Sequence, residues 1–476
     1  MSTPTPGIEA QFAQAQALWE LSDVARAEDV LRAVLARDPG HEDASFLLAR
    51  ALQTGGRLDA AARTIFDLCR ARGFPAELGR RAAQFIQLGQ RQAVAADLCQ
   101  ATLDRGHSTP ALLAVAGNLA RELGDFARAR GFYLAALDAG VDLDVHYVLG
   151  ALAHTLRYED AAHPDFARFE VHLRDGAASP RAHAATGFGL AKARDDLGDH
   201  ESAARVLREA NARVRSVLPW SADAWDAAVE ARCRERITCA PVPARSDFVP
   251  VFVVGLPRTG TTLAASRLAQ ASVARDRGEL RMLRFIAGQL IGGGHLGDAA
   301  ALEEAAALYR VHARQDDAPA TWYIDQDPLN YQYLHVVEAL FPNARIIHCV
   351  RERRDTALSL WSQDFAHAEC AFAFDFEGIA RYAAGHDRLM RHWHRTLSLP
   401  IHTLAYEDLV ADPVAAVERL RVFAGVPAAA TGATHAAPIV SASVWQARQP
   451  VYARSVGRWR RYAPFVPELD RFARAD

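Results

Sequence analysis

Lysine is almost absent from this chain of 476 residues. Lys192 is the only lysine, and arginine supplies the rest of the 54 positive charges. A motif that requires a lysine can therefore be complete only if that lysine is Lys192. The formal net charge of -3 gives no general reason to expect binding to nucleic acid or to an anionic membrane. Any affinity for phosphate must come from a local site.

Cysteine motifs and long apolar runs are also missing. The six cysteines have no C-x-x-C spacing and no partnering histidine motif, so neither a zinc site nor a disulfide framework is predicted. No apolar run approaches the length of a membrane span, and Met1–Ala10 lacks the features of a signal peptide. We therefore expect a cytoplasmic protein with no membrane span, no bound metal and no nucleic-acid partner.

The first half of the chain contains an internal repeat. A Gly-x-x-x-x-Ala pattern, usually with leucine before the glycine, recurs along residues 10–215. The copies are Gly56–Ala61, Gly89–Val94, Gly124–Ala129 and Gly198–Ala203, with Ser22–Ala27 as a weaker first copy and Arg157–Ala162 as a degenerate one. Spacings near 34 residues are typical of tetratricopeptide (TPR) repeats, in which each copy is a helix, a tight turn and a second helix.

Stacked helix pairs of this kind bury a continuous core and leave a concave groove. The groove is a candidate site for a protein or peptide partner. A purely stabilising or dimerising role for the repeats is equally open.

A domain boundary is predicted near residue 240. Two prolines, Pro241 and Pro243, interrupt the helical pattern just before a β-like run. We predict a helical repeat domain over residues 1–240 and an α/β domain over residues 241–476.

The α/β region opens with a strand, a glycine-rich loop and a helix. Residues 251–254 are apolar and β-branched, and Gly255-Leu256-Pro257-Arg258-Thr259-Gly260-Thr261-Thr262 follows them. Such a loop directs backbone N–H groups and a helix N-terminus at an anion, and the two threonines add hydroxyl donors. The spacing is that of a nucleotide-binding P-loop, but Thr261 stands where NTPases need lysine. A GTPase or ATPase is therefore disfavoured.

A second anion site is predicted after another buried strand, residues 344–350. Arg351 follows at the carboxyl end of this strand, where open α/β sheets bind ligands, and Ser359 lies eight residues later on a predicted helix. Two separate anion sites suit a ligand with two separate phosphate groups.

The two motifs, in this order, resemble those of sulfotransferases. Pro257–Thr262 is similar to the 5′-phosphosulfate loop of the protein-tyrosine and TPR-linked branches, and Arg351 with Ser359 resembles their 3′-phosphate motif. The chain is identified as resembling TPR-linked sulfotransferases, and its C-terminal domain resembles protein-tyrosine sulfotransferases. The resemblance implies an all-α TPR solenoid followed by a P-loop-like α/β sulfotransferase domain with a mainly parallel sheet flanked by helices.

The same resemblance implies the ligand and the site. The sulfuryl donor would be 3′-phosphoadenosine-5′-phosphosulfate (PAPS), the product 3′-phosphoadenosine-5′-phosphate, and the acceptor a hydroxyl group. Glu279 would be the base, Arg258 would stabilise the leaving oxygen, and Ser443 would donate to the sulfuryl oxygens. The expected nucleotide-binding residues are Arg258, Thr259, Gly260, Thr261, Thr262, Arg351, Ser359, Tyr406 and Arg458.

One position departs from the family. Where an Asp-Lys-x-Pro motif is common, this chain has Asp325-Gln326-Asp327-Pro328, so the charged assistant of the sulfuryl group is missing. The leading hypothesis is an active sulfotransferase acting on a peptidyl tyrosine, a carbohydrate or a small molecule. The alternative is a TPR scaffold whose sulfotransferase domain binds nucleotide but turns over weakly. A small-molecule kinase ranks third, because it leaves Ser359 without a role.

Overall fold

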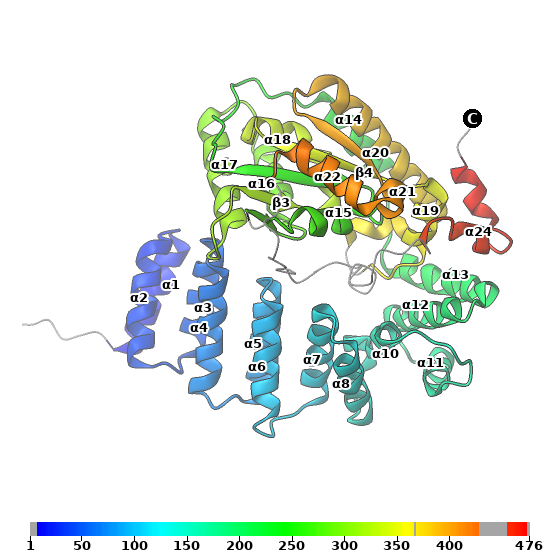
Figure 1. Cartoon of the computed structure of the whole chain (residues 1–476). Helices are drawn as coiled ribbons and strands as arrows, with labels where there is room; N and C mark the ends of the chain where they lie inside the picture. The colour runs from blue at the N-terminus through cyan, green and yellow to red at the C-terminus, as the bar shows by residue number, and fades with distance from the viewer. Residues whose placement is uncertain (1–6, 272, 366–367, 428–454, 474–476) are drawn as a thin grey trace, which may run out of the picture. The chain divides into compact units, whose positions relative to one another are not determined.

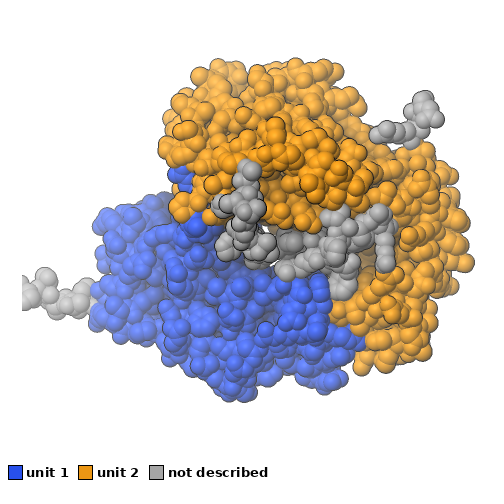
Figure 2. Space-filling view, in the orientation of Figure 1, with its two compact units in different colours: residues 1–142, 314–318 blue, residues 143–313, 319–476 orange. Residues whose placement is uncertain are grey.

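The computed structural model covers the whole chain and describes residues 7–271, 273–365, 368–427 and 455–473 (Figure 1). The chain divides into two compact units. Unit 1 comprises residues 1–142 and 314–318, and unit 2 comprises residues 143–313 and 319–476 (Figure 2).

Unit 1 is a stack of helical hairpins. Its helices are α1 (Ile8–Glu20), α2 (Val24–Arg37), α3 (Glu42–Thr54), α4 (Leu58–Ala71), α5 (Ala76–Leu88), α6 (Gln92–Leu103), α7 (Pro110–Leu123) and α8 (Phe126–Asp138). Apolar residues from successive pairs, such as Leu31, Leu48, Ile65 and Leu98, form one buried core. The stacking of pairs around a shared core is what the repeat pattern predicts.

The tight turn of each repeat contains one residue in the left-handed region. These residues are Ser22, Gly56, Gln90 and Gly124, with φ of 61°, 70°, 57° and 83°. They are 34 residues apart, and five residues after each of them comes an alanine that is at most 1% exposed: Ala27, Ala61, Ala95 and Ala129. The sequence pattern had placed the third turn at Gly89 with Val94. Gly89 is instead the C-cap of α5 at φ -78°, so the register is shifted by one residue.

The next copy differs from the expected hairpin. Around Arg157 the chain forms α9 (Leu143–His146), α10 (Val148–Leu152) and η1 (Ala153–Thr155), and residues 156–163 form no helix before α11 (Pro164–Arg174). The regular form returns with α12 (Pro180–Asp196) and α13 (His200–Val217), joined at Gly198 with φ 78°. Helix α14 (Ala222–Arg234) follows.

The sheet of unit 2 has five parallel strands in the order β2-β3-β1-β4-β5. The strands are β1 (Val249–Gly255), β2 (Ala274–Asp276), β3 (Trp322–Asp325), β4 (Arg345–Val350) and β5 (Ile401–Ala405). Because all strands are parallel, the residues that follow β1, β2, β3 and β4 emerge at the same edge. The two anion motifs and Glu279 all lie at this carboxyl edge.

Helices cover both faces of the sheet (Figure 1). They are α15 (Thr261–Leu268), α16 (Met282–Gly292), α17 (Ala299–Arg314), η2 (Pro328–Tyr333), α18 (Leu334–Leu340), α19 (Arg353–Trp361), η3 (Ala368–Phe374), α20 (Phe376–Thr396), α21 (Tyr406–Ala411), α22 (Pro413–Ala424), α24 (Trp459–Tyr462) and η5 (Pro467–Phe472).

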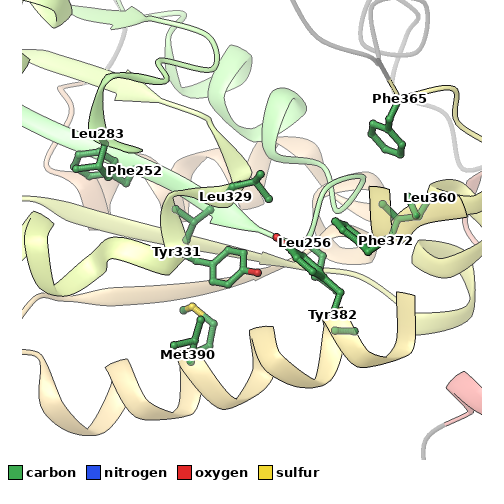
Figure 3. Packing of buried hydrophobic residues seen from close by; sticks show 14 of the residues in the cluster. Phe252, Leu256, Leu283, Leu329, Tyr331, Leu360, Phe365, Phe372, Tyr382 and Met390 are labelled. Atoms are coloured by element: carbon green, nitrogen blue, oxygen red, sulfur yellow. The ribbon is translucent and has the colours of Figure 1, made fainter. Parts of the chain in front are cut away.

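The alternation of side chains along β1 divides the core into two layers. Val251 and Val253 pack with α15 and α22 on one face. Phe252 and Val254 belong to the core on the other face, where Met390 and Tyr382 of α20 lie near Tyr331 (Figure 3). A strand buried on both faces explains why this segment is apolar without interruption.

The change from helices to sheet occurs around residue 240, between the end of α14 at Arg234 and the start of β1 at Val249. The compact units divide earlier, after Asp142. The reason is that Phe188 of α12 and Leu207 of α13 share one core with Phe252 and Trp361. The last helices of the repeat region are thus packed into the unit that holds the sheet, while the domain boundary near residue 240 stays a prediction.

Candidate functional site

The glycine-rich loop between β1 and α15 has the form of an anion site. Gly260 is the N-cap of α15, at φ 96°, and no side chain caps the N-terminal amides of this helix. A Cβ atom on Gly260 would lie 2.6 Å from the ring of Tyr406. Glycine is therefore needed both for the backbone conformation and for the contact with Tyr406.

The loop residues beside Gly260 are largely buried. Thr259, Thr261 and Thr262 are all less than 9% exposed. The hydroxyl of Thr259 donates to the carbonyl oxygen of Leu256 at 2.7 Å, so it braces the loop. Arg258 adopts φ 75°, which is unusual for a residue other than glycine and is a feature that concentrates at functional sites.

The two anion motifs, about a hundred residues apart in sequence, are in direct contact. Arg258 Nε donates to Ser359 Oγ at 3.1 Å, and Arg351 Nη1 donates to the carbonyl oxygen of Arg258 at 3.1 Å. The loop, Arg351 and Ser359, which the sequence assigned to two anion sites, thus lie together in the structure, and their role in binding an anion stays a prediction.

Arg351 is held in place by a second set of contacts. Its Nη2 donates to the carbonyl oxygen of Ser455 at 2.6 Å, and its guanidinium lies over the ring of Tyr406, 4.7 Å from the centroid. Tyr406 and Ser455 share a hydrogen bond of 2.7 Å between their hydroxyl groups. Nε of Arg351 is buried and has no hydrogen-bond partner among the described residues. Burial lowers the pKa of Arg351, so this guanidinium is suited to an anionic partner.

A cavity of about 860 Å³ lies beside these residues at the carboxyl ends of β1, β4 and β5. Its lining includes Thr259, Arg351, Glu352, Thr356 and Glu407. The cavity is large enough for a nucleotide-sized ligand.

Glu279 lies at the same edge, two strands from β1. The β2–β3 ladder continues past the strand ends, since the amide of Gln326 donates to the carbonyl oxygen of Gly278 at 2.9 Å. Asp327, two residues after the end of β3, lies close enough for its charge to act on Glu279. Burial, followed by repulsion from Asp327, raises the pKa of Glu279 to about 7. A carboxylate with this pKa can accept and release a proton near neutral pH.

Asp327 is balanced by a neighbouring arginine. Arg284 of α16 donates to Asp327 at 2.9 Å and pairs with Glu369 at 2.7 Å. Asp325, also buried, accepts hydrogen bonds from Tyr309 OH and from the amide of Leu280. Burial and the charge of Asp327 raise the pKa of Asp325 well above its usual range. The charges of Asp327, Arg284 and Glu369 all act on the carboxyl group of Glu279.

Gln326, which stands where the family motif has lysine, is 2% exposed. Its Oε1 is buried and has no hydrogen-bond partner among the described residues. A buried amide oxygen without a partner is costly, which makes this position a candidate contact for a ligand.

Two expected site residues need separate comment. Arg458 lies 3.2 Å from Asp195 of α12, and its Nη1 donates to Ser362 Oγ at 3.3 Å. Sequence reasoning missed Asp195, because an acidic pair before a repeat turn carries no signal of a distant contact. Ser443 lies outside the described residues.

The described part of the chain contains no cluster of three or more histidine, cysteine or acidic side chains arranged to hold a metal ion. Among the same residues, no helix has the length and apolar character needed to cross a bilayer.

This geometry defines an α/β domain in which a P-loop-like loop is in contact with a second candidate anion motif. Residues 250–430 match the model of the Sulfotransferase family, and residues 12–73 match a Tetratricopeptide repeat. The chain therefore carries a sulfotransferase domain behind TPR repeats.

Individual relatives are distant. An uncharacterized protein of Aquifex aeolicus (strain VF5) is 28% identical over 320 residues, which are 62% of this chain and 42% of that protein. The chain thus matches less than half the length of this relative.

Solved sulfotransferases are also similar to this chain. The sulfotransferase domain of the Synechococcus PCC 7002 olefin synthase has 20% identity and a TM-score of 0.34, with 50% of this chain and 100% of that domain covered. Sulfotransferase STF9 from Mycobacterium avium has 16% identity and a TM-score of 0.30, with 68% of this chain and 93% of that protein covered.

Proposed function

We propose that the protein transfers a sulfuryl group from PAPS to a hydroxyl acceptor. The observation that carries this proposal is the contact between Arg258, Arg351 and Ser359, which joins two anion-binding motifs in one site. A donor with a 5′-phosphosulfate and a separate 3′-phosphate needs two such motifs, whereas an ordinary kinase substrate needs one phosphate track and a metal ion.

The residues fit this donor. The loop 255–262 would hold the 5′-phosphosulfate with its backbone amides and the N-terminus of α15. Arg351, with its buried and unpartnered Nε, would hold the 3′-phosphate together with Ser359. PAPS would supply an activated sulfate bond, and no metal is required by this scheme.

Each catalytic role follows from charge. Glu279 would take the proton of the acceptor hydroxyl, and its pKa of about 7 suits that task. Arg258 would stabilise the negative charge that develops on the leaving oxygen, since its guanidinium fork can contact two oxygens together. Ser443 is proposed to donate to the sulfuryl oxygens, and Tyr406 and Arg458 to contact the nucleotide.

Calorimetric titration with 3′-phosphoadenosine-5′-phosphate tests the donor assignment. We expect micromolar or tighter binding to the full chain, loss of binding in the Arg351→Ala/Ser359→Ala variant, and no comparable binding of ATP. No binding to the wild type, or a preference for ATP, would refute the assignment.

A second candidate is a TPR scaffold whose nucleotide-binding domain has little turnover. Gln326 favours it, because an amide at this position supplies no charge to the sulfuryl group. Tight nucleotide binding without sulfuryl transfer from labelled PAPS to any hydroxyl acceptor would support the scaffold over the enzyme.

The repeats supply a candidate partner site. A groove of about 460 Å³ in unit 1 is lined by α1, α3 and α5, with Phe12, Phe46, Phe85, Arg50 and Arg81 among its residues. We infer that it binds a protein or peptide, which would make a peptidyl tyrosine one acceptor and leave carbohydrates and small molecules open. If the acceptor is a protein, Phe46→Ser/Phe85→Ser should abolish its sulfation and spare that of a small phenol.

A further inference from the structure

A short C-terminal segment connects the anion site to a helix of the repeat region. We call residues Ser455–Tyr462 the clasp. At its first residue, the carbonyl oxygen of Ser455 accepts from Arg351 and its hydroxyl bonds to Tyr406. The position of the Arg351 guanidinium thus depends on where the clasp lies.

The middle of the clasp is fixed to the start of α19. The carboxylate of Asp355 accepts from the amide of Gly457 at 2.6 Å and from the amide of Trp459 at 2.9 Å. The guanidinium of Arg354 lies over the ring of Trp459, 3.7 Å from its centroid. Arg351, Arg354 and Asp355 all lie in residues 351–355. This segment therefore contacts the first half of the clasp.

The far end of the clasp is fixed to Asp195, at the end of α12. Arg458 Nη2 lies 3.2 Å from Asp195 Oδ2, and the hydroxyl of Tyr462 donates to Asp195 Oδ1 at 2.6 Å. His200, from the first turn of α13, lies 3.2 Å from the same carboxylate. One carboxylate from the repeat helices therefore holds two residues of the clasp.

The charges in this cluster favour the ion pair. Burial acts to raise the pKa of Asp195, but Arg458, His200 and Tyr462 outweigh it and hold that pKa far below its usual range. The pKa of Arg458 is raised by Asp195 against the effect of burial. Removing the carboxylate charge leaves a partly buried guanidinium without its counterion, which destabilises the position that Arg458 now takes.

We propose that Asp195 is a positioning residue for the nucleotide site. It holds Arg458 and Tyr462, and through the clasp it keeps Ser455 against Arg351 and Tyr406. The inference rests on the proposed function, because it assigns the affected site to the 3′-phosphate of the nucleotide. The repeat helices α12 and α13 are then part of the machinery that sets nucleotide affinity.

The neighbouring residue offers a matched control. Asp196 follows Asp195 at the same helix end and pairs with Lys192 at 2.7 Å, and its carboxylate accepts from the amide of Tyr158. None of these contacts involves the clasp. Asp196→Asn therefore removes a partly buried ion pair from the same helix while leaving the path to Arg351 intact.

The experiment compares calorimetric titrations of 3′-phosphoadenosine-5′-phosphate into full-length wild type, Asp195→Asn and Asp196→Asn. We expect the first variant to weaken binding by about tenfold or more, and the second by less than about twofold. Equal weakening in both variants, or unchanged binding in Asp195→Asn, would overturn the proposal.

A double-mutant cycle separates positioning from general loss of structure. Ser455→Ala removes the hydroxyl that bonds to Tyr406 at the opposite end of the clasp from Asp195 and leaves the side chain of Tyr406 in place. If both residues act through the clasp, the double variant should bind nucleotide about as weakly as Asp195→Asn alone. Independent, additive losses would contradict the proposal.

Hydrogen exchange in the nucleotide-free protein gives a readout that does not need the proposed function. In Asp195→Asn, the amides of Gly457 and Trp459 should exchange at least about tenfold faster than in wild type, and in Asp196→Asn they should not. If wild type binds no nucleotide, the donor assignment fails while exchange still reports on the clasp. Unchanged exchange at these amides would refute the positioning role by itself.

Discussion

Replacing Glu279 with glutamine should stabilise unit 2 while removing the proposed base. The pKa of Glu279 rises from its ordinary value of 4.5 to about 7 in the folded chain. A group with a raised carboxyl pKa favours folding at low pH, where it is protonated in the folded state, and this contribution is lost as pH rises through about 7. Above that pH the folded protein must hold a disfavoured charge, which glutamine does not carry.

The size of the effect follows from the pKa change. At about 1.4 kcal/mol per pKa unit, a difference of about 2.5 units lowers the free energy of unfolding of the wild type by about 3 kcal/mol at pH 8. At pH 5 the same difference lowers it by less than about 1 kcal/mol. We therefore expect Glu279→Gln to be more stable than wild type by up to about 3 kcal/mol at pH 8, with the gain nearly gone at pH 5.

Urea unfolding followed by tryptophan fluorescence measures this gain. Seven of the eight tryptophans of the sequence follow residue 142, with Trp19 the exception, so fluorescence reports mainly on unit 2. Glu304→Gln, which removes an exposed glutamate from α17, is the matched control and should follow the wild type at both pH values. A Glu279→Gln variant that is no more stable than wild type at pH 8, or that gains equally at pH 5, would refute the reasoning.

Four further outcomes are expected. With a hydroxyl acceptor, kcat/KM should rise with pH and level off above about 7, because Glu279 must be ionised; a profile that is flat from pH 5 to 9 would exclude it as the base. Gly260→Ala should weaken nucleotide binding at least about tenfold in calorimetry, since the added methyl collides with Tyr406 and the φ of 96° suits glycine; unchanged binding would mean that the loop adjusts freely. Gln326→Lys should raise kcat by about tenfold or more with little change in nucleotide affinity, and an unchanged kcat would remove the reason to regard this position as a catalytic deficit. Asp316→Asn should lower the stability of unit 1 by about 1 kcal/mol in thermal unfolding, because its carboxylate caps α4 by accepting from the amides of Asp59 and Ala60 at 2.9 Å each; a loss in unit 2 alone would contradict this.

The sequence was sufficient for features that depend on local patterns. The 34-residue repeat, the apolar strand before Gly255 and the glycine-rich loop all express short-range rules of helix packing, strand burial and backbone freedom. The register of the third repeat was wrong by one residue, because glycine is common both at a helix C-cap and in a left-handed turn. At Gln90 the chain adopts the turn without glycine.

The association of distant segments was decided by the tertiary structure. The sequence assigned the loop and the pair Arg351 and Ser359 to two anion sites, and it placed Arg351 at the carboxyl end of a strand, where open α/β sheets bind ligands. The contact between the two motifs came only with the fold. Nothing in the sequence indicated that Arg458 of the clasp pairs with Asp195 of α12. An ion pair between residues so far apart requires only opposite charges, and it leaves no periodic pattern in the sequence. Likewise, Glu279 could be chosen from the sequence, but its pKa of about 7 comes from burial and from Asp327, which follows the neighbouring strand β3, and these surroundings exist only once the sheet has formed.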